Sequence, residues 1–180
     1  FDVVIPSRSL REFTSVFSDD IETVEVFFAN NQILFRSEHI SFYTRLLEGN
    51  YPDTDRLIPT EFNTEATFNV ANLRFAMERA RLLSNATQNG TVKLEFKNGV
   101  VSSHVHSPEV GRVNEEIDTS AVSGEDLSIS FNPTYLIEAL KAIDSEQVVI
   151  RFISSVRPFT LVPEGNEQGF IQLITPVRTN

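Results

Sequence analysis

Two pairs of side chains in this sequence have the types and the spacing that chemistry requires. His104 and His106 stand two residues apart in a strand-like run, so they share one face and could bind a metal ion. Asp53 and Asp55 could act as the two acids of a hydrolase. However, no carboxylate or third histidine lies at ligand spacing from the histidines, and the aspartates lie between two prolines, where turn and cap chemistry explains them. We interpret the first pair as a solvated strand face and the second as part of a turn.

Other catalytic signatures are missing from the sequence. It contains no cysteine, so no disulfide or thiolate metal site can form. It also contains no glycine-rich phosphate loop, Ser-His-Asp pattern or nucleophile elbow. We therefore expect a protein that is not an enzyme and that uses no metal or cofactor. A small-molecule enzyme remains one alternative, and it would need a polar pocket with perturbed carboxylates or histidines. A protein-binding repeat module unrelated to DNA is the other.

Composition and charge narrow the class of protein further. The 180 residues are 41% hydrophobic, enough for one domain and a piece of another. No apolar run approaches the roughly 20 residues that cross a bilayer, and we expect a soluble, cytoplasmic protein. The net charge of −10 argues against binding DNA over the whole surface. Because the chain opens on FDVVIP without a methionine, we also expect a fragment of a longer protein.

The elements that must position these side chains occur as a repeat. Residues 5–10 (IPSRSL), 68–73 (FNVANL) and 131–136 (FNPTYL) begin alike, and their starts are 63 residues apart both times. Each start leads into a helical pattern, which predicts helices over 7–17, 70–84 and 133–143. Each helix has one apolar stripe. The stripes consist of Leu10, Phe13, Val16 and Phe17, of Leu73, Met77, Ala80 and Leu83, and of Leu136, Leu140 and Ile143.

Caps and turns complete the repeating unit. Ser7, Asn69 and Asn132 are the expected N-caps of the three helices. A β-rich segment follows each helix, and the pairs Asn30-Asn31 and Asn98-Gly99 suit hairpin turns because these residue types tolerate positive φ. The unit is thus one short strand, one helix and three strands. We expect an α+β fold with the helices on one side and antiparallel sheets on the other, because units with one apolar face must pair.

Charge separates the helices from the strands. The three helical segments carry six basic and three acidic side chains, although the whole chain is strongly acidic. A mildly basic helical face could lie near a phosphate backbone while the acidic strands avoid it.

Three segments resemble one known family. LEGNYPDTDRLIP at 47–59, FNPTYLIEALKAI at 131–143 and LITPVRTN at 173–180 resemble the bacterial DNA sliding clamp, the beta subunit of the replicative DNA polymerase III. The likeness covers essentially the whole chain. It implies a DNA-clamp fold, and a homodimeric ring that encircles double-stranded DNA and keeps the polymerase on it as a processivity factor. Residues 1–54 would be the second half of the middle domain, and 55–180 the C-terminal domain.

The resemblance also implies a peptide-docking cleft for DNA polymerase subunits, the clamp loader and repair proteins. One wall would come from the junction between the middle and C-terminal domains, with Pro52, Arg56 and Leu57. The opposite wall would come from the third repeat and the end of the chain. Its residues would be Asn132, Tyr135, Pro158, Leu173, Ile174, Thr175, Pro176, Val177 and Arg178.

Two further sets of residues are implied by the same resemblance. Helix arginines would face the DNA in the hole of the ring: Arg8, Arg11, Arg74, Arg79 and Arg81. The subunit interface would contain Leu82, Leu83, Glu115 and Glu116.

Overall fold

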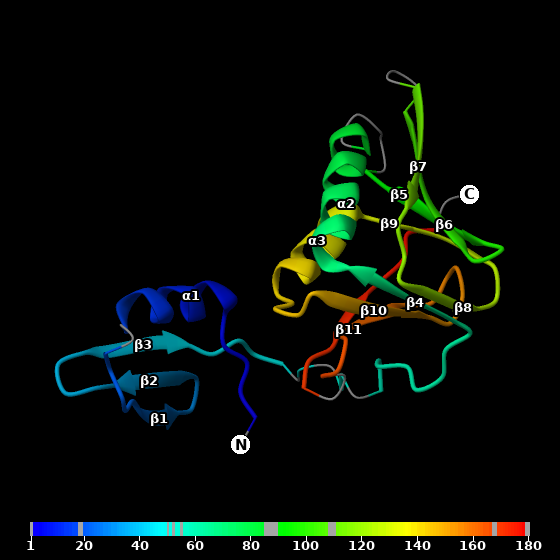
Figure 1. The fold of residues 1–180 in the computed structure, drawn as a ribbon. Coiled ribbons are helices and arrows are strands. Elements are labelled where there is room, and N and C mark those ends of the chain that lie inside the picture. The colour runs from blue at the N-terminus through cyan, green and yellow to red at the C-terminus, as the bar shows by residue number, and fades with distance from the viewer. Residues whose placement is uncertain are drawn as a thin grey trace. The chain divides into compact units, whose positions relative to one another are not determined.

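The computed structural model describes residues 2–17, 20–49, 51, 53–54, 56–84, 90–107, 111–166 and 169–178 (Figure 1). The chain divides into two compact units, Phe1–Thr54 and Asp55–Asn180, which we call the first and the second unit. None of the described helices is long and apolar enough to span a membrane.

The first unit contains one helix and one small sheet. Helix α1 (Ser7–Val16) precedes β1 (Glu25–Ala29), β2 (Gln32–Arg36) and β3 (Ser41–Arg45). These strands form an antiparallel sheet in the order β1-β2-β3, and a single bridge joins Val4 to Leu47. This is the predicted order of elements, with the opening strand reduced to that bridge.

Aromatic rings hold α1 on its sheet. The ring of Phe13 lies 4.6 Å from that of Phe35 and 4.5 Å from that of Phe17, measured between centroids. A hydrogen bond of 2.8 Å also joins the hydroxyls of Ser9 and Thr44. Among the described residues of this unit, only Phe17 and Ile33 are buried hydrophobics. The apolar stripe of α1 is therefore only partly covered.

The second unit contains the other two repeats and an additional strand. Its first repeat comprises β4 (Thr64–Asn69), α2 (Val70–Ser84), β5 (Val92–Lys97), β6 (Val100–Ser107) and β7 (Gly111–Ile117). The short strand β8 (Ala121–Gly124), which the sequence did not suggest, follows. The last repeat comprises β9 (Leu127–Phe131), α3 (Pro133–Lys141), β10 (Gln147–Phe152), β11 (Phe159–Pro163) and β12 (Gln172–Ile174).

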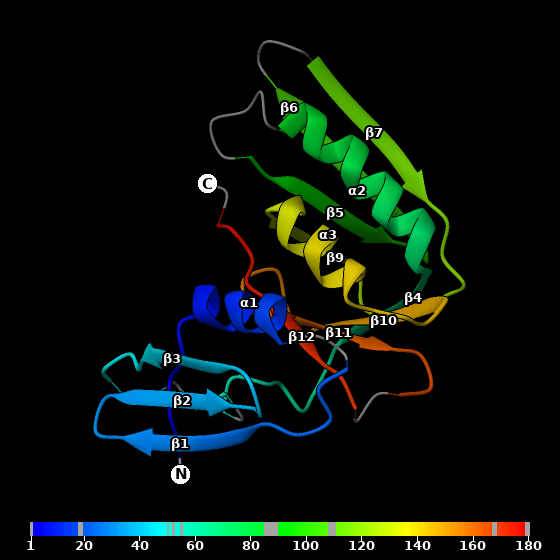
Figure 2. The ribbon, with the colours of Figure 1, turned by 90° about the vertical axis from the view of Figure 1, so that its left-hand side faces the viewer.

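The two repeats of the second unit exchange their opening strands. The antiparallel sheets have the orders β12-β11-β10-β4-β8 and β7-β6-β5-β9, so β4 pairs with the last repeat and β9 with the preceding one. Helices α2 and α3 lie side by side against the strands (Figure 2). The expected α+β fold with helices packed on antiparallel sheets is confirmed.

The core of the second unit is continuous across both repeats. The predicted stripe residues Leu73, Met77, Leu136 and Leu140 are all buried in it. Phenylalanine rings connect the two sheets, with centroid distances of 4.9 Å for Phe96–Phe152 and 5.2 Å for Phe131–Phe159. Within the five-stranded sheet, the rings of Phe152 and Phe159 lie 5.1 Å apart. Close packing of this kind gives the unit a rigid scaffold for surface sites.

Two of the three predicted helix caps are present. The side-chain oxygen of Asn69 accepts a hydrogen bond from the backbone N–H of Asn72 at 3.0 Å, and Asn132 accepts one from Thr134 at 2.9 Å. The cap predicted at Ser7 is wrong. Ser7 lies inside the helix, and Pro6 occupies the cap position without a side-chain hydrogen bond.

The two predicted hairpin turns differ in their backbone conformation. Asn98 and Gly99 have φ values of 52° and 77°, as the turn between β5 and β6 requires. The hairpin turn predicted at Asn30-Asn31 is also confirmed, because it joins the antiparallel strands β1 and β2. It forms without positive φ, since Asn98 is the only non-glycine residue with positive φ in the described part of the chain.

Candidate functional site

Helix α3 presents three side chains to one surface of the second unit. Asn132 caps its first turn and Pro133 stands at its first position, so the helix start is well defined. Tyr135, Glu138 and Ala139 follow at spacings of three and four residues, which places them on neighbouring positions of one helix side. Tyr135 leaves 59% of its surface exposed. The helix therefore supplies an aromatic ring and a carboxylate to the surface.

The end of the chain forms the facing wall. Strand β12 pairs with β11, with Leu173 opposite Thr160 and Ile174 opposite Phe159. Beyond the strand, the N–H of Val177 donates a 2.7 Å hydrogen bond to the carbonyl of Ser130 at the end of β9. These backbone bonds hold the terminal segment against β11 and the end of β9.

A cleft of about 500 Å³ lies between these two walls. Four of the predicted peptide-binding residues line it: Tyr135, Leu173, Ile174 and Thr175. Three further residues line it that were not predicted from the sequence: Glu138, Ala139 and Gln172. Helical spacing from Tyr135 was a signal that could have identified the first two. A cleft of this size, lined by both apolar and polar side chains, suits a few side chains of a short peptide.

The remaining residues predicted on this wall lie outside the lining of the cleft. Asn132 serves as the helix cap, Pro158 is half-buried before β11, and Pro176 is half-buried beyond β12. Val177 and Arg178 are exposed in the terminal segment. They follow Thr175, which lines the cleft, in the chain.

The junction wall is described only in part. Pro52 lies outside the described residues, as does Asp55. Arg56 and Leu57 are exposed and do not line the cleft. Asn63 fixes the end of this segment, because its N–H donates to the carbonyl of Phe152 at 2.8 Å and its side-chain amide donates to that of Ile153 at 3.0 Å.

Most of the predicted DNA-facing arginines already contact acidic partners. Arg8 lies 3.0 Å from Glu12, and Arg74 lies 3.8 Å from Glu78. Arg11 and Arg81 form no ion pair with another described residue. The Arg8–Glu12 pair is exposed and the Arg74–Glu78 pair is half-buried. Ion pairs within a helix contribute little to stability, so these guanidinium groups can still respond to an external anion.

Arg79, a predicted DNA-facing residue, contacts a residue that was predicted for the subunit interface. It forms an ion pair with Glu115 of β7, a predicted interface residue. The guanidinium of Arg79 also donates a hydrogen bond to that carboxylate, and this bond raises the pKa of Arg79. The two side chains line a cavity of about 260 Å³ between α2 and β7, where Glu116 also lies. Of the other interface candidates, Leu82 is 72% exposed and Leu83 packs against the core.

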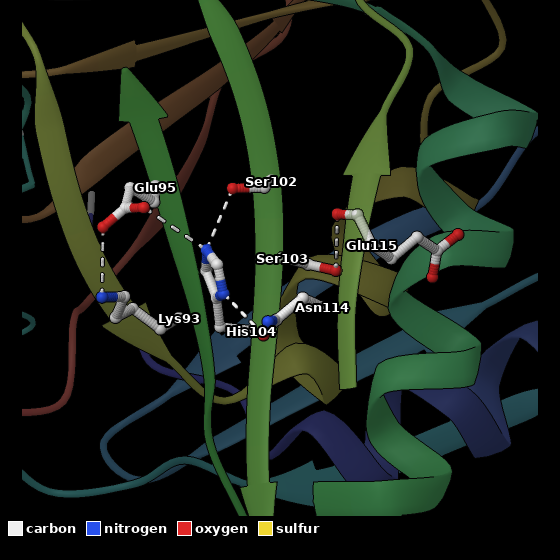
Figure 3. Close-up of polar contacts among 7 residues, drawn as sticks. All are labelled: Lys93, Glu95, Ser102, Ser103, His104, Asn114 and Glu115. Carbon is white, nitrogen blue, oxygen red and sulfur yellow. Dashed lines mark hydrogen bonds and ion pairs between the residues drawn. The ribbon is translucent and has the colours of Figure 1, made fainter. Parts of the chain in front are cut away.

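His104 belongs to a polar network on β5, β6 and β7 (Figure 3). Its Nδ1 lies 2.8 Å from the side-chain oxygen of Asn114, and its Nε2 lies 2.9 Å from the hydroxyl of Ser102 and 3.5 Å from Glu95. The Glu95 neighbour could not be read from sequence spacing, because strand pairing supplies it. The pKa of Glu95 is lowered, mainly by the hydrogen bond and charge of Lys93 and less by His104 and Lys97.

The described residues of this network are not arranged like the ligands of a metal ion. Arg112 stands directly opposite His106 in the β6–β7 pairing, which puts a cation beside it. Within the described ranges, no group of three or more histidines or acids is placed to bind a metal ion. The lowered pKa of Glu95 is the result of its half-buried ion pair with Lys93, because burial by itself would raise that pKa.

Comparisons with known proteins cover both units. Residues 55–178 match the family described as DNA polymerase III beta subunit, C-terminal domain, and residues 1–53 match its central domain. The beta sliding clamp of Streptococcus pneumoniae is 81% identical over 180 residues, which is 100% of this chain and 48% of that protein. The clamp of Lactococcus lactis is 55% identical, again over 100% of this chain and 48% of the relative.

Solved structures agree with the sequence matches. The S. pneumoniae DNA polymerase III beta chain has a TM-score of 0.95 and 80% identity, covering 99% of this chain and 48% of that one. The Bacillus subtilis sliding clamp has a TM-score of 0.90 and 38% identity, covering 100% and 47%. The chain spans about half the length of these relatives. These matches confirm the resemblance found in the sequence: the chain belongs to the DNA polymerase III beta subunit family, the beta sliding clamps.

Proposed function

We propose that this chain is part of a non-enzymatic sliding clamp that tethers a DNA polymerase to double-stranded DNA and docks the short linear motifs of replication and repair proteins. In this proposal, residues 1–54 are the second half of the central domain and 55–180 are the C-terminal domain. The observation that carries it is the cleft between α3 and β12, because residues from two distant segments that resemble the clamp meet there. Family membership supports the DNA-tethering part.

The composition of the cleft favours a short peptide as its ligand. Leu173 and Ile174 offer apolar surface, and Tyr135 adds an aromatic face with a polar tip. Such a groove takes up leucine and phenylalanine side chains of a linear motif. Because it is small, we expect affinities on the order of micromolar, which allow one partner to replace another.

DNA contact would be loose in this proposal. A closed ring stays on DNA by topology, so the helix arginines need only screen phosphate charge. Arg8 and Arg74 are partly neutralised by Glu12 and Glu78, which weakens any contact they make. Arg11 and Arg81 would contribute most among the five, since neither pairs with an acid within the described residues.

We place the homodimer contact of the longer protein at the α2 and β7 surface. Strand β7 forms one edge of the four-stranded sheet, and an edge strand has backbone groups available for pairing with another chain. The highly exposed side chain of Leu82 adds apolar surface nearby. The clamp loader, polymerase subunits and repair proteins would then share the peptide cleft.

Peptide titration tests this function directly. We would measure fluorescence polarisation of a labelled peptide with a glutamine-leucine-x-leucine-phenylalanine motif against the protein, beside a scrambled peptide. We expect saturable binding of the intact motif only. Thr175→Arg should weaken it at least about 10-fold, because a bulky side chain would fill the small cleft. Leu57→Glu should also weaken it, because the family resemblance assigns Leu57 to the second wall of the docking surface.

Val100→Arg is the matched control, since it introduces the same side chain at an exposed position of the same unit that does not line the cleft. Circular dichroism would establish that each variant is folded. Equal affinity of Thr175→Arg and the parent protein, or absence of motif-specific binding by the parent, would contradict the proposal.

A further inference from the structure

We propose that Glu138 makes the cleft selective for charge, so that it prefers peptides carrying a lysine or arginine beside the apolar motif. The proposal rests on the peptide-docking function above and specifies the chemistry of the partner. Of the described residues that line the cleft, Glu138 is the only one that carries a full charge at neutral pH. A single carboxylate in an otherwise neutral lining makes the electrostatic potential of the cleft negative near that side chain.

The carboxylate is available to a ligand. One oxygen, Oε1, accepts a hydrogen bond from Lys141 at 2.9 Å, and Oε2 makes no hydrogen bond with a described residue. The side chains of Glu138 and Lys141 remain 60% and 50% exposed. An exposed pair three residues apart on one helix is weak, so a cation from a peptide can share or replace Lys141.

The other end of the same surface has the opposite sign. The hydrogen bond from Val177 to Ser130 holds the terminal segment close to the start of α3, because Ser130 lies three residues before Pro133. Arg178 directly follows Val177 in this segment. The start of α3 adds the positive end of the helix dipole there. Glu138 lies more than one turn further along the helix, where its carboxylate pairs with Lys141 of the last turn. Among the described residues, the surface therefore carries unpaired positive charge near the start of α3 and an exposed, exchangeable acid–base pair near its end.

Gln172 adds a neutral polar group to the lining. It is half-buried in β12 opposite Leu161, and its amide can both donate and accept hydrogen bonds. It can therefore bind a peptide backbone without opposing the charge preference set by Glu138. In this cleft, apolar side chains would supply most of the affinity for a peptide, and one charged side chain would supply specificity.

Peptides of opposite charge test the inference. We would titrate the parent motif peptide and sister peptides in which a single lysine or glutamate is placed in turn at each flanking position. The wild-type protein should bind the best lysine peptide about 2- to 5-fold more tightly than its glutamate counterpart, the range of an exposed ion pair. Higher salt should reduce this difference.

Matched variants assign the preference to one residue. Glu138→Gln should abolish it, Glu138→Lys should invert it, and Lys141→Met should increase it by freeing the carboxylate. Glu164→Lys is the control, because it makes the same charge change at an exposed turn of the same unit.

The two proposals fail in different ways. If the parent motif binds but lysine and glutamate peptides bind equally at every position, or if Glu138→Lys keeps the wild-type preference, charge selection by Glu138 is overturned and peptide docking stands. If the parent motif does not bind at all, the docking function is overturned and this inference with it.

Discussion

The two units of this chain place the same residue of the repeat in different environments. Leu10, Leu73 and Leu136 hold the corresponding position of the three repeats. In the second unit Leu73 and Leu136 are 0% exposed, whereas Leu10 of the first unit is 43% exposed. The sequence pattern of an apolar helix stripe is therefore not sufficient for burial. A second helix must cover it.

Strand exchange explains the difference. In the second unit, β4 pairs with β10 and β9 pairs with β5, so neither repeat can form its sheet without the other. This arrangement brings α2 and α3 together over one core. The first unit contains a single repeat, and its helix packs on its own three strands through the Phe13 ring.

Truncation of the three corresponding leucines should give the largest difference in stability between the two units. Leu73→Ala and Leu136→Ala should each lower the free energy of unfolding by about 2–5 kcal/mol, because each leaves a cavity in a close-packed core. Leu10→Ala should cost less than about 1 kcal/mol, since much of that side chain is already in water. Urea unfolding followed by circular dichroism would measure all three.

Hydrogen exchange would localise the loss to one unit. Protection should fall across α2 and α3 in the Leu73→Ala and Leu136→Ala proteins and remain unchanged in α1. A loss as large for Leu10→Ala as for Leu73→Ala would mean that the first unit buries its helix in solution.

Helix capping should give a smaller difference between the units. Asn69→Ala and Asn132→Ala remove side-chain caps that accept hydrogen bonds at 3.0 Å and 2.9 Å, so each should destabilise the protein by about 1 kcal/mol. Ser7→Ala should have almost no effect because Ser7 makes no cap bond. The shift of the urea midpoint would measure each change, and a cost at Ser7 matching that at Asn69 would contradict the assignment.

The smallest effect concerns acid stability of the second unit. The pKa of Glu95 is lowered in the folded state, mainly by Lys93, so its contribution to stability is complete above the ordinary glutamate pKa of about 4.3. That contribution is lost as the pH falls through the lower folded-state pKa. Lys93→Met should raise the carboxyl pKa of Glu95 toward its ordinary value, which carboxyl NMR titration would detect. No change in the titration would show that Lys93 is not the cause.

Local features of the fold could be predicted from the sequence. The 63-residue repeat located all three helices, and the caps at Asn69 and Asn132 followed from residue type and position. The Asn98-Gly99 turn followed from its tolerance of positive φ. These are interactions within a few residues of each other, and local chemistry determines them.

Interactions between distant segments were harder to predict. Strand β8, the contact of Glu95 with His104 and the ion pair of Arg79 with Glu115 join residues from different elements, so sequence spacing contains no signal for them. The family resemblance suggested Tyr135, Leu173, Ile174 and Thr175 for the cleft but gave no reason to include Gln172.

The sequence by itself determined the type of each repeat, the apolar stripe of each helix, two of the three caps and the family of the protein. Only the tertiary structure decided which stripes are buried, that the second and third repeats exchange strands, and that Glu138 faces the cleft. The physical reason is that periodicity and caps depend on neighbours in the chain, whereas burial and site geometry depend on which distant surfaces pack together.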